Sequence, residues 1–170
     1  MNMTWHRSHR ADRRALPVAD RHYNRQKIGS PQFVPPGRCL VLLTADERAL
    51  WVTSWPFAEY VKHRWGGAWV CSCFRKEGGG KASEMIREAL AATRHKFGEP
   101  PPLGLVTFID PSFVRPIMVR GVPTYGWTWI KAGFEPDGET KGGLLAFRIR
   151  PENMPAPCAP LAQFGELQFA

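Results

Sequence analysis

Residues 68–97 constrain the fold of this chain most, because an apolar run, three successive glycines and an amphipathic run follow one another there. Residues 68–74 are short, apolar and rich in residue types that favour β-structure, which predicts a strand. From residue 82 to residue 97 apolar side chains recur at helical spacing, which predicts an amphipathic helix. Gly98 and the prolines at 100–102 end that helix. A glycine loop must therefore join the end of a strand to the start of a helix.

This glycine loop is a candidate anion-binding site. The three glycines at 78–80 can adopt positive φ and leave one side of the loop without Cβ atoms, so backbone N–H groups can converge on a phosphate. The helix N-terminus adds a partial positive charge, and Arg75 and Lys81 add full charges. The loop is not a P-loop, because Ala82 follows Lys81 where that motif requires Ser or Thr. It also lacks the Gly-x-Gly-x-x-Gly of dinucleotide-binding folds. A plain flexible turn is the alternative interpretation.

The remaining periodic segments indicate a mixed α/β (α+β) fold in one domain. Two apolar runs at 38–44 and 49–55 flank a polar turn, which predicts a hairpin. Residues 103–109 and 141–150 predict further strands, and residues 125–132 predict a helix of two turns. The length of 170 residues fits a single domain. We expect a basic N-terminal arm at 1–27, the domain proper at 28–150 and a Pro/Ala-rich tail at 151–170.

The net charge of +8 limits the classes of partner. Residues 1–27 are rich in arginine with only two Asp, and residues 112–123 hold Arg115 and Arg120 without an opposing acid. Such segments are either solvated surface or contacts for nucleic acid. No apolar run reaches the ~18 residues of a membrane span, and the polar, arginine-rich beginning is unlike a secretory signal. We therefore expect a cytoplasmic protein that does not enter a membrane.

The four cysteines include no C-x-x-C pair, which favours buried, reduced thiols, with a zinc site as the alternative. Cys71 and Cys73 are two apart on the predicted strand, so we expect them to face the same side.

Two positions carry side chains suited to proton transfer. His22 and Tyr23 are adjacent, and Asp110 ends the strand predicted at 103–109. A carboxylate at that end of a central strand can act as a general base or bind a metal. An ordinary surface histidine and a turn-forming aspartate are the alternatives. The seven tryptophans either fill the core or wall a cleft that binds flat rings.

The order strand, Arg75-x-x-Gly78-x-Gly80, helix resembles the acyl-CoA pyrophosphate loop of the GNAT N-acyltransferase superfamily. Residues 103–109 are similar to the next strand of that fold, and residues 125–134 to its late helix. The resemblance covers roughly residues 38–150. It implies a mixed, mostly antiparallel sheet of about six strands flanked by helices, splayed between the strand before the loop and the next strand. The splayed pair would take the pantetheine arm of acetyl-CoA or another acyl-CoA. The residues assigned to this cofactor are Phe74, Arg75, Gly78, Gly79, Gly80 and Lys81.

Within the superfamily the chain resembles the Mom-like DNA-modifying proteins of phages. It shares with them the pair His22-Tyr23, a strand ending in Phe-x-Asp at 108–110, and a Tyr-containing helix before Ala-Gly-Phe at 132–134. The resemblance implies transfer of an acyl-derived group to an exocyclic amine of a base, adenine first, in double-stranded phage DNA. The base would be flipped out of the duplex. Such a protein acts against restriction in the cytoplasm of an infected bacterial host.

The candidate catalytic residues are His22, Tyr23, Asp110 and Tyr125. The family motif does not fix the base, for which Asp110 and His22 are the candidates. Tyr125, on the late helix, would donate a proton to the leaving thiol. Iron is a further implied cofactor, with His22 and Asp110 as ligands. The residues expected to contact DNA are Arg21, Arg25, Lys27, Arg115 and Arg120. Two other functions stay open: an acetyl-CoA-dependent N-acetyltransferase for a protein or small-molecule amine, and a non-catalytic nucleic-acid-binding module.

Overall fold

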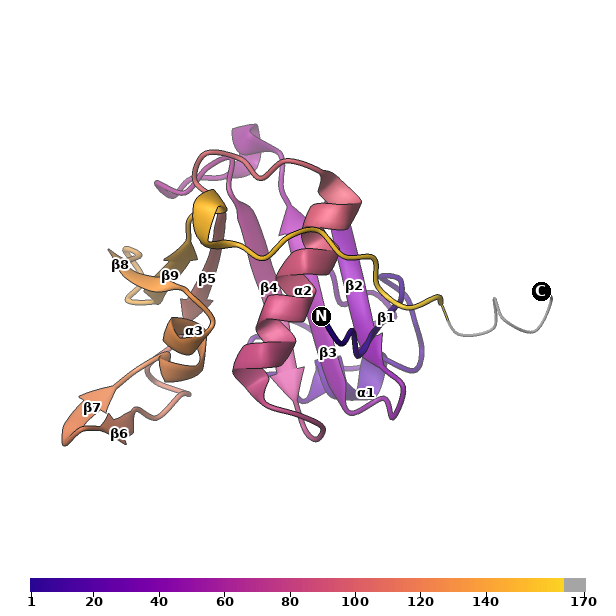
Figure 1. Ribbon diagram of the computed structural model, residues 1–170, viewed down its shortest axis with the longest axis horizontal. Helices are drawn as coiled ribbons and strands as arrows, with labels where there is room; N and C mark the ends of the chain where they lie inside the picture. Colours follow the sequence, from indigo (N-terminus) through magenta and orange to yellow (C-terminus); the bar gives the residue numbers. More distant parts are fainter. Residues whose placement is uncertain (164–170) are drawn as a thin grey trace.

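A seven-stranded sheet organises the molecule in the computed structural model, which describes residues 1–163. The strand order is β1-β2-β3-β4-β5-β9-β8, and every neighbouring pair is antiparallel except β4 and β5 (Figure 1). A separate two-stranded hairpin, β6–β7, projects from the body below β5. The strands are β1 Trp5–Arg7, β2 Arg38–Thr44, β3 Ala49–Trp55, β4 Trp69–Lys76, β5 Leu105–Ile109, β6 Ile117–Val119, β7 Val122–Thr124, β8 Glu135–Glu139 and β9 Leu145–Ile149.

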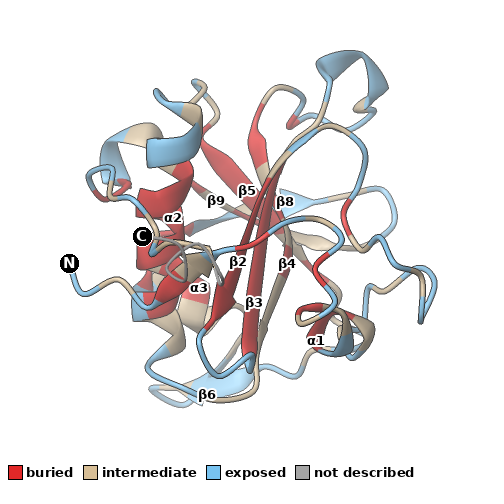
Figure 2. Cartoon of the chain, turned by 90° about the vertical axis from the view of Figure 1, so that its right-hand side faces the viewer, coloured by how far each residue is buried: buried red, intermediate tan, exposed pale blue. Residues whose placement is uncertain are grey.

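The helices lie on both faces of the sheet. The long helix α2 (Ala82–Phe97) crosses one face, and the short helix α1 (Leu16–Asp20) lies on the other (Figures 1 and 2). A third helix, α3 (Trp127–Lys131), follows the β6–β7 hairpin and contacts α2. Short 3₁₀ turns lie at Ala58–Tyr60 and Pro151–Asn153. No helix within residues 1–163 is long and apolar enough to cross a membrane.

Burial of both faces explains why β2 reads as an unbroken apolar run. Leu40 and Leu42 belong to the core cluster under α2, whereas Val41 and Leu43 belong to the cluster under α1. Successive side chains of a strand point to opposite faces, so a strand covered on both sides needs apolar residues at every position. Figure 2 accordingly shows β2 and β3 buried along their length.

The mixed α+β class with a mostly antiparallel sheet is confirmed. The hairpin predicted at 38–44 and 49–55 and the helix predicted at 82–97 have the expected bounds. The sheet has seven strands, where the resemblance implied about six. Strands β1 and β8 and the β6–β7 hairpin were not among the elements predicted from periodicity.

Residues 1–27, expected as a basic arm that leads into the domain, pack into the body of the structure and contribute β1 to the sheet. Trp5 is fully buried and its indole N–H donates to the Met85 carbonyl at 2.9 Å. Asp12 is buried and accepts hydrogen bonds from Ser8 and Arg14. The few apolar side chains of this polar segment hold it against the domain. Burying a tryptophan stabilises the folded state by several kcal/mol at most, on the order of the largest apolar side chains, whereas an arginine that stays in water changes the stability little.

The predicted Pro/Ala-rich tail packs on the surface of the domain as far as it is described. Residues 155–161 run across α2 (Figure 1), where the Cys158 amide donates to the Ala91 carbonyl at 3.1 Å. Leu161 then forms a parallel bridge with His6 of β1. Residues 164–170 of this tail lie outside the described residues.

Candidate active site between two parallel strands

The parallel strands β4 and β5 pair over three residues and then separate. Their register runs from Trp69↔Leu105 to Cys71↔Thr107, although β4 continues to Lys76 and β5 to Ile109. On its other side, β4 has a register shift against β3, which places Ser72 as an extra residue between Cys71 and Cys73. A β-bulge bends its strand, so this bulge accounts for the separation from β5 at the same residue. We call the space beyond Cys71 and Thr107 the interstrand opening.

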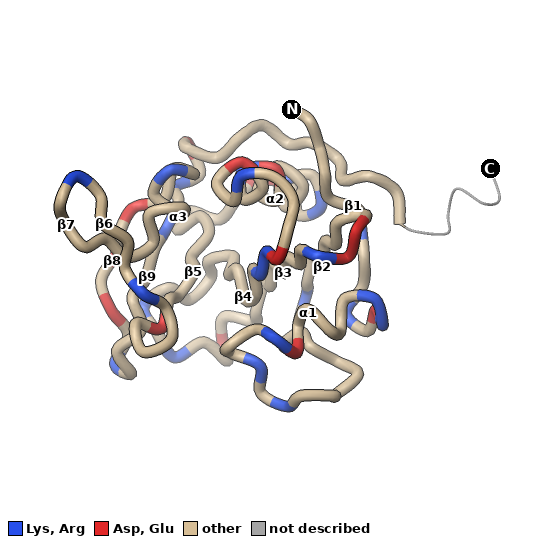
Figure 3. Tube along the Cα trace, turned by 90° about the horizontal axis from the view of Figure 1, so that it is seen from below, with Lys and Arg blue, Asp and Glu red and all other residues tan. Residues whose placement is uncertain are grey.

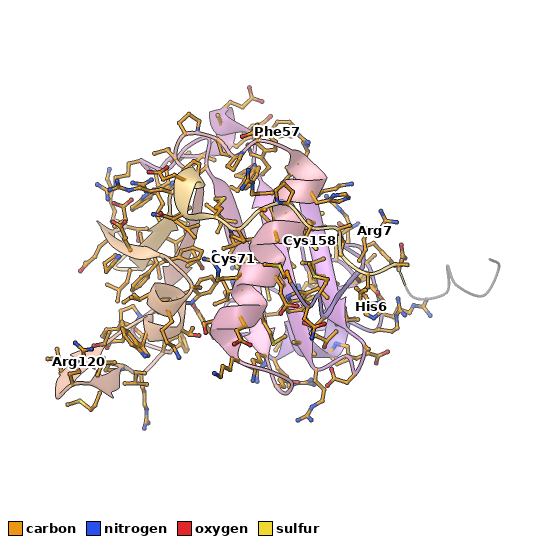
Figure 4. All side chains as sticks on the ribbon, viewed as in Figure 1. His6, Arg7, Phe57, Cys71, Arg120 and Cys158 are labelled. Atoms are coloured by element: carbon orange, nitrogen blue, oxygen red, sulfur yellow. The ribbon has the colours of Figure 1, made fainter. Side chains whose placement is uncertain are left out.

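The same bulge changes which face two cysteines occupy. Cys71 lies in the cluster under α2 and Cys73 in the cluster under α1, whereas regular alternation predicted one shared side. Burial raises the pKa of the Cys73 thiol to about 12 and that of Cys71 well above its usual value. Both thiols therefore stay protonated at neutral pH and are poor nucleophiles. Cys71, the third residue of β4, lies in the middle of the molecule (Figure 4).

Side chains from the segment after α1 enter the interstrand opening. The Asn24 side-chain amide donates to the Ser72 carbonyl of β4 at 2.9 Å. The Tyr23 hydroxyl donates to the Phe108 carbonyl at 3.5 Å and accepts from the Asp110 amide at 3.4 Å. Strand edges that lack a neighbouring strand need such partners. The two Tyr23 bonds are long and therefore weak, so another polar group can replace them at low cost.

Two cavities meet at Tyr23 and Asn24. The smaller, the interstrand cavity, has a volume of about 140 Å³ and is lined by both strands and by His22, Val114 and Trp129. The larger has a volume of about 710 Å³, lies over β4 beneath residues 24–36, and includes Asp110 in its wall. Tyr23, Asn24 and the bulged residue Ser72 line both. Cys71, Cys73 and Phe108 also line both, so the two cavities share a wall of six residues.

The two titratable side chains of the His22-Tyr23 pair have opposite pKa shifts for the same reason. Burial lowers the pKa of His22, and the neighbouring Arg75 lowers it further. Burial raises the pKa of the Tyr23 phenol. At neutral pH His22 is therefore an uncharged imidazole that can accept a proton, and Tyr23 is a phenol that can donate a hydrogen bond.

An aromatic ladder leads from this pair to the surface. The His22 and Tyr23 rings stack with centroids 4.7 Å apart, and Tyr23 stacks on Phe113 at 5.6 Å with an interplanar angle of 10°. Phe113 is 68% exposed, so the outer face of the ladder is open to solvent. A flat ring can stack on such a face.

The glycine loop follows β4 directly and leads into α2 as predicted. Gly79 adopts φ +87°, and a Cβ at Gly80 would meet no atom within 4 Å, so one side of the loop is open. A Cβ at Gly78 would lie 2.8 Å from the Arg48 guanidinium carbon, which packs over the loop. Helix α2 begins after Lys81 without a side-chain cap. The amides of its first turn are therefore directed at the loop, where they can bind an anion.

A carboxylate that sequence analysis missed controls the charge of this loop. Glu77 accepts hydrogen bonds from Arg75 at 2.7 Å and from both ends of the Arg21 guanidinium, with the Arg21 Nε at 2.6 Å. These bonds, Arg21 first, lower the pKa of Glu77 to about 2. Arg48 donates to the Glu77 carbonyl at 2.7 Å. An incoming phosphate would compete with Glu77 for Arg75. Sequence alone did not mark Glu77, because only Arg75 is near it in sequence, whereas Arg48 and Arg21 are 29 and 56 residues away.

The structure brings together three of the four predicted catalytic residues. His22, Tyr23 and Asp110 lie around the interstrand opening, with Asp110 also capping its own turn by accepting from the Ser112 amide at 2.9 Å. Tyr125 packs against the core cluster under α2 and is absent from the walls of both cavities as described for residues 1–163. Trp129, one turn further along α3, lines the interstrand cavity in its place. The other fully buried tryptophans fill the core.

The cations predicted to contact DNA divide into two groups. Arg21 is paired with Glu77, and Arg25 is held by Asp20 and by the Ser30 and Gln32 carbonyls, which fixes the loop that follows α1. Lys27 is exposed on that loop. Arg115 and Arg120 are exposed, the latter at the outer end of the β6–β7 hairpin (Figure 4).

The predicted iron ligands do not form a metal site in this arrangement. Residues 1–163 contain no group of three or more His, Cys, Asp or Glu side chains that could hold a metal ion. The His22 Nδ1 accepts from the Asn24 amide at 3.2 Å, and the ring also bonds the Phe74 backbone, so both sides of the imidazole are engaged.

Comparison with known proteins adds no relative: no protein-family model, curated protein or solved structure matches this chain.

Proposed function

We propose that this protein is a GNAT-like acyltransferase that transfers an acyl-derived group from an acyl-CoA to an exocyclic amine of a base, adenine first, in double-stranded DNA. The proposal rests on one observation above all. The interstrand cavity and the large cavity share Tyr23, Asn24 and the residues of β4 around the bulge at Ser72, and β4 then leads into the glycine loop. An enzyme that joins two substrates needs two binding sites that share one wall.

The glycine loop and the interstrand opening suit the donor. The amides at the start of α2 and the side chains of Arg75 and Lys81 would hold the diphosphate. The edges of β4 and β5, now bonded to Tyr23 and Asn24, are where the amides of a pantetheine arm would pair. When bound, the acyl-CoA supplies a thioester that is reactive toward amines.

The large cavity suits the acceptor. Its wall combines apolar side chains with the polar groups of Asn24, Gln26 and Asp110, and the exposed ring of Phe113 lies at its rim. Asp110, in the wall of this cavity, can take the proton that the amine loses. His22 lines the interstrand cavity instead, where its ring is already hydrogen-bonded and holds the position of Tyr23. Tyr23 can donate a hydrogen bond to the oxygen or sulfur that gains charge. The position of Tyr23 gives it the role that sequence resemblance assigned to Tyr125.

Mass spectrometry of nucleosides from bacterial DNA tests this function. DNA from cells that express the protein should contain a mass-shifted base, with adenosine examined first. The Tyr23→Phe and Asp110→Asn variants keep the shape of the site, and Asn at 110 retains the acceptor for the Ser112 amide. Both should lose the modified base. Unaltered nucleosides in cells that contain folded wild-type protein would contradict the proposal.

A second function is favoured by the open glycine loop alone, which suits any acyl-CoA-dependent N-acetyltransferase. If nucleosides are unaltered but purified protein releases CoA thiol in the presence of protein or small-molecule amines, this function replaces the first. The Lys81→Ala variant should then raise the KM for acyl-CoA more than it lowers kcat, because Lys81 contacts the diphosphate and not the reacting atoms.

A further inference from the structure

The β6–β7 hairpin is a projecting ribbon whose two faces are both apolar. Its turn at Arg120 and Gly121 has φ of +51° and +80°, which is the type I′ geometry of tight hairpins. Register places Ile117 and Val122 on one face and Met118 on the other. All three are more than half exposed, at 51%, 59% and 66%. A two-stranded ribbon in water normally keeps at least one polar face, so this ribbon indicates a partner.

The root of the hairpin is fixed beside the candidate active site. Asp110 accepts hydrogen bonds from the Phe113 and Val114 amides, so the chain turns tightly as it leaves β5. Val114 and Tyr125, at the two ends of the hairpin, pack against the core cluster under α2. Val114 also lines the interstrand cavity. A partner held by the hairpin therefore lies at a defined position relative to Tyr23 and Asp110.

The charge of the segment selects the chemistry of this partner. Residues 111–134 contain Arg115, Arg120 and Lys131 and no Asp or Glu. Arg115 and Arg120 have no hydrogen bond or ion pair within residues 1–163, although most other arginines of the protein are paired. Figure 3 shows the hairpin with basic residues and without acidic ones. One arginine lies at the root of the apolar ribbon and the other at its turn. This arrangement matches a polyanion that also offers apolar surface.

We propose that the β6–β7 hairpin inserts into a groove of duplex DNA. Arg115 and Arg120 bind phosphates, and Ile117, Met118 and Val122 press against a base step and unstack it. A two-stranded ribbon fits the major groove, and apolar wedges kink duplexes at the steps they enter. Unstacking beside Asp110 would lower the cost of turning a base toward the large cavity, where the outer face of Phe113 is open. This inference rests on the proposed DNA substrate and adds how the duplex is engaged.

The test is fluorescence of a duplex that carries 2-aminopurine, titrated with purified protein without any acyl donor. Wild-type protein should raise the fluorescence, since an unstacked 2-aminopurine is brighter. A triple variant, Ile117→Thr/Met118→Thr/Val122→Thr, retains β-forming residues and should abolish the rise while weakening binding about tenfold. Phe57→Thr is the matched control, because Phe57 is equally exposed but lies at the opposite end of the molecule from Arg120 (Figure 4).

A second pair of variants separates charge from insertion. Arg115→Gln/Arg120→Asn should reduce the slope of log affinity against log salt by about 2, one for each phosphate contact. Asn at 120 tolerates the positive φ of the turn, so the hairpin persists. Lys62→Gln/Lys96→Gln, which removes two exposed charges elsewhere, should leave the slope within about 0.5 of the wild-type value.

Three results would overturn the inference. The first is that wild-type protein does not bind duplex DNA, and the second is that the triple variant still gives the full rise in fluorescence. The third is that wild-type protein binds phosphatidylglycerol vesicles more tightly than DNA and the triple variant loses this vesicle binding. The last would make the hairpin a lipid contact. Wild-type protein that unstacks the duplex but leaves its bases unmodified in the presence of acyl-CoA would refute the proposed function and leave the hairpin inference standing.

Discussion

Two basic regions of this molecule use their arginines in opposite ways. In residues 1–27 the cations hold the protein's own structure: Arg10 donates to the Gly37 carbonyl, Arg14 to Asp12, and Arg21 to Glu77. In the β6–β7 hairpin and its root, Arg115 and Arg120 point into solvent. The difference follows from what surrounds each charge. The first region carries two aspartates and a buried tryptophan, whereas the second carries no acid and exposes its apolar side chains. A basic segment is thus available to bind a partner only where its charged side chains have no hydrogen-bond or ion-pair partner within the protein.

The largest expected effect comes from Trp5, which docks the first region. Trp5→Ala should lower the free energy of unfolding by about 3–5 kcal/mol, because it leaves a cavity under α2 and removes the bond to the Met85 carbonyl. Urea denaturation followed by circular dichroism measures this loss. A change below about 1 kcal/mol would mean that residues 1–27 are an arm after all.

Asp12 should have the next largest effect. Asp12→Ala should cost about 1–3 kcal/mol, since the Ser8 hydroxyl and the Arg14 guanidinium lose their buried acceptor. Burial alone would raise the pKa of Asp12, but the bonds from Arg14 and Ser8 outweigh it and lower the pKa. Its stabilisation is therefore present above about pH 4 and is lost as the pH falls through the folded pKa. Urea denaturation at pH 7 and pH 3 should show a smaller gap between variant and wild type at the lower pH.

Glu77→Gln releases Arg21 and Arg75 from their ion pairs, so it tests how much paired arginines contribute to stability. The loss of stability should be on the order of 1 kcal/mol, because these ion pairs are open to solvent. The pKa of Glu77 is lowered to about 2, so the stability that it adds is complete above about pH 4.5 and disappears toward pH 2. The variant should lack this part of the acid sensitivity. It should also bind CoA roughly two- to fivefold more tightly, measured by calorimetry, since phosphate no longer competes with a carboxylate. Weaker binding of CoA would mean that Glu77 matters more for holding the loop in shape than for competing with phosphate for the arginines.

The smallest effect is expected in the second region. Arg120→Asn should change the free energy of unfolding by less than about 0.5 kcal/mol, because Arg120 is exposed and asparagine accepts its positive φ. Thermal denaturation of the Arg120→Asn and Trp5→Ala variants beside wild type compares the two losses of stability. A destabilisation near that of Asp12→Ala would show that Arg120 has a structural role and would erase the contrast between the two regions.

Periodicity predicted the elements that bury a continuous face. The hairpin of β2 and β3 follows from two short apolar runs that flank a polar turn, and α2 follows from apolar residues at helical spacing. Strand β1 escaped prediction because it is three residues long and only Trp5 is buried. Strand β8 contains Pro136 and Gly138, which are typical of turns, and forms because β9 lies alongside it.

The candidate site was predictable where it depends on neighbours in sequence. The glycine loop and the adjacency of His22 and Tyr23 are visible in the chain itself. The approach of Tyr23 to Asp110 joins residues 87 apart, and the bulge at Ser72 depends on how β3 and β4 pair. Tyr125 was misplaced because resemblance fixes the order of elements and leaves the direction of a side chain open. Glu77, Arg48 and Asn24 were missed for the same reason, since their partners come from other elements.

The bridge between His6 and Leu161 has a consequence for how the protein is made. During synthesis β1 can pair with β2 soon after both have emerged, but its outer edge waits for a segment about 150 residues further along the chain. During that interval the edge can accept a strand from another nascent chain. The edge is covered when residues 155–161 cross α2 and Leu161 exchanges backbone hydrogen bonds with Trp5 and Arg7.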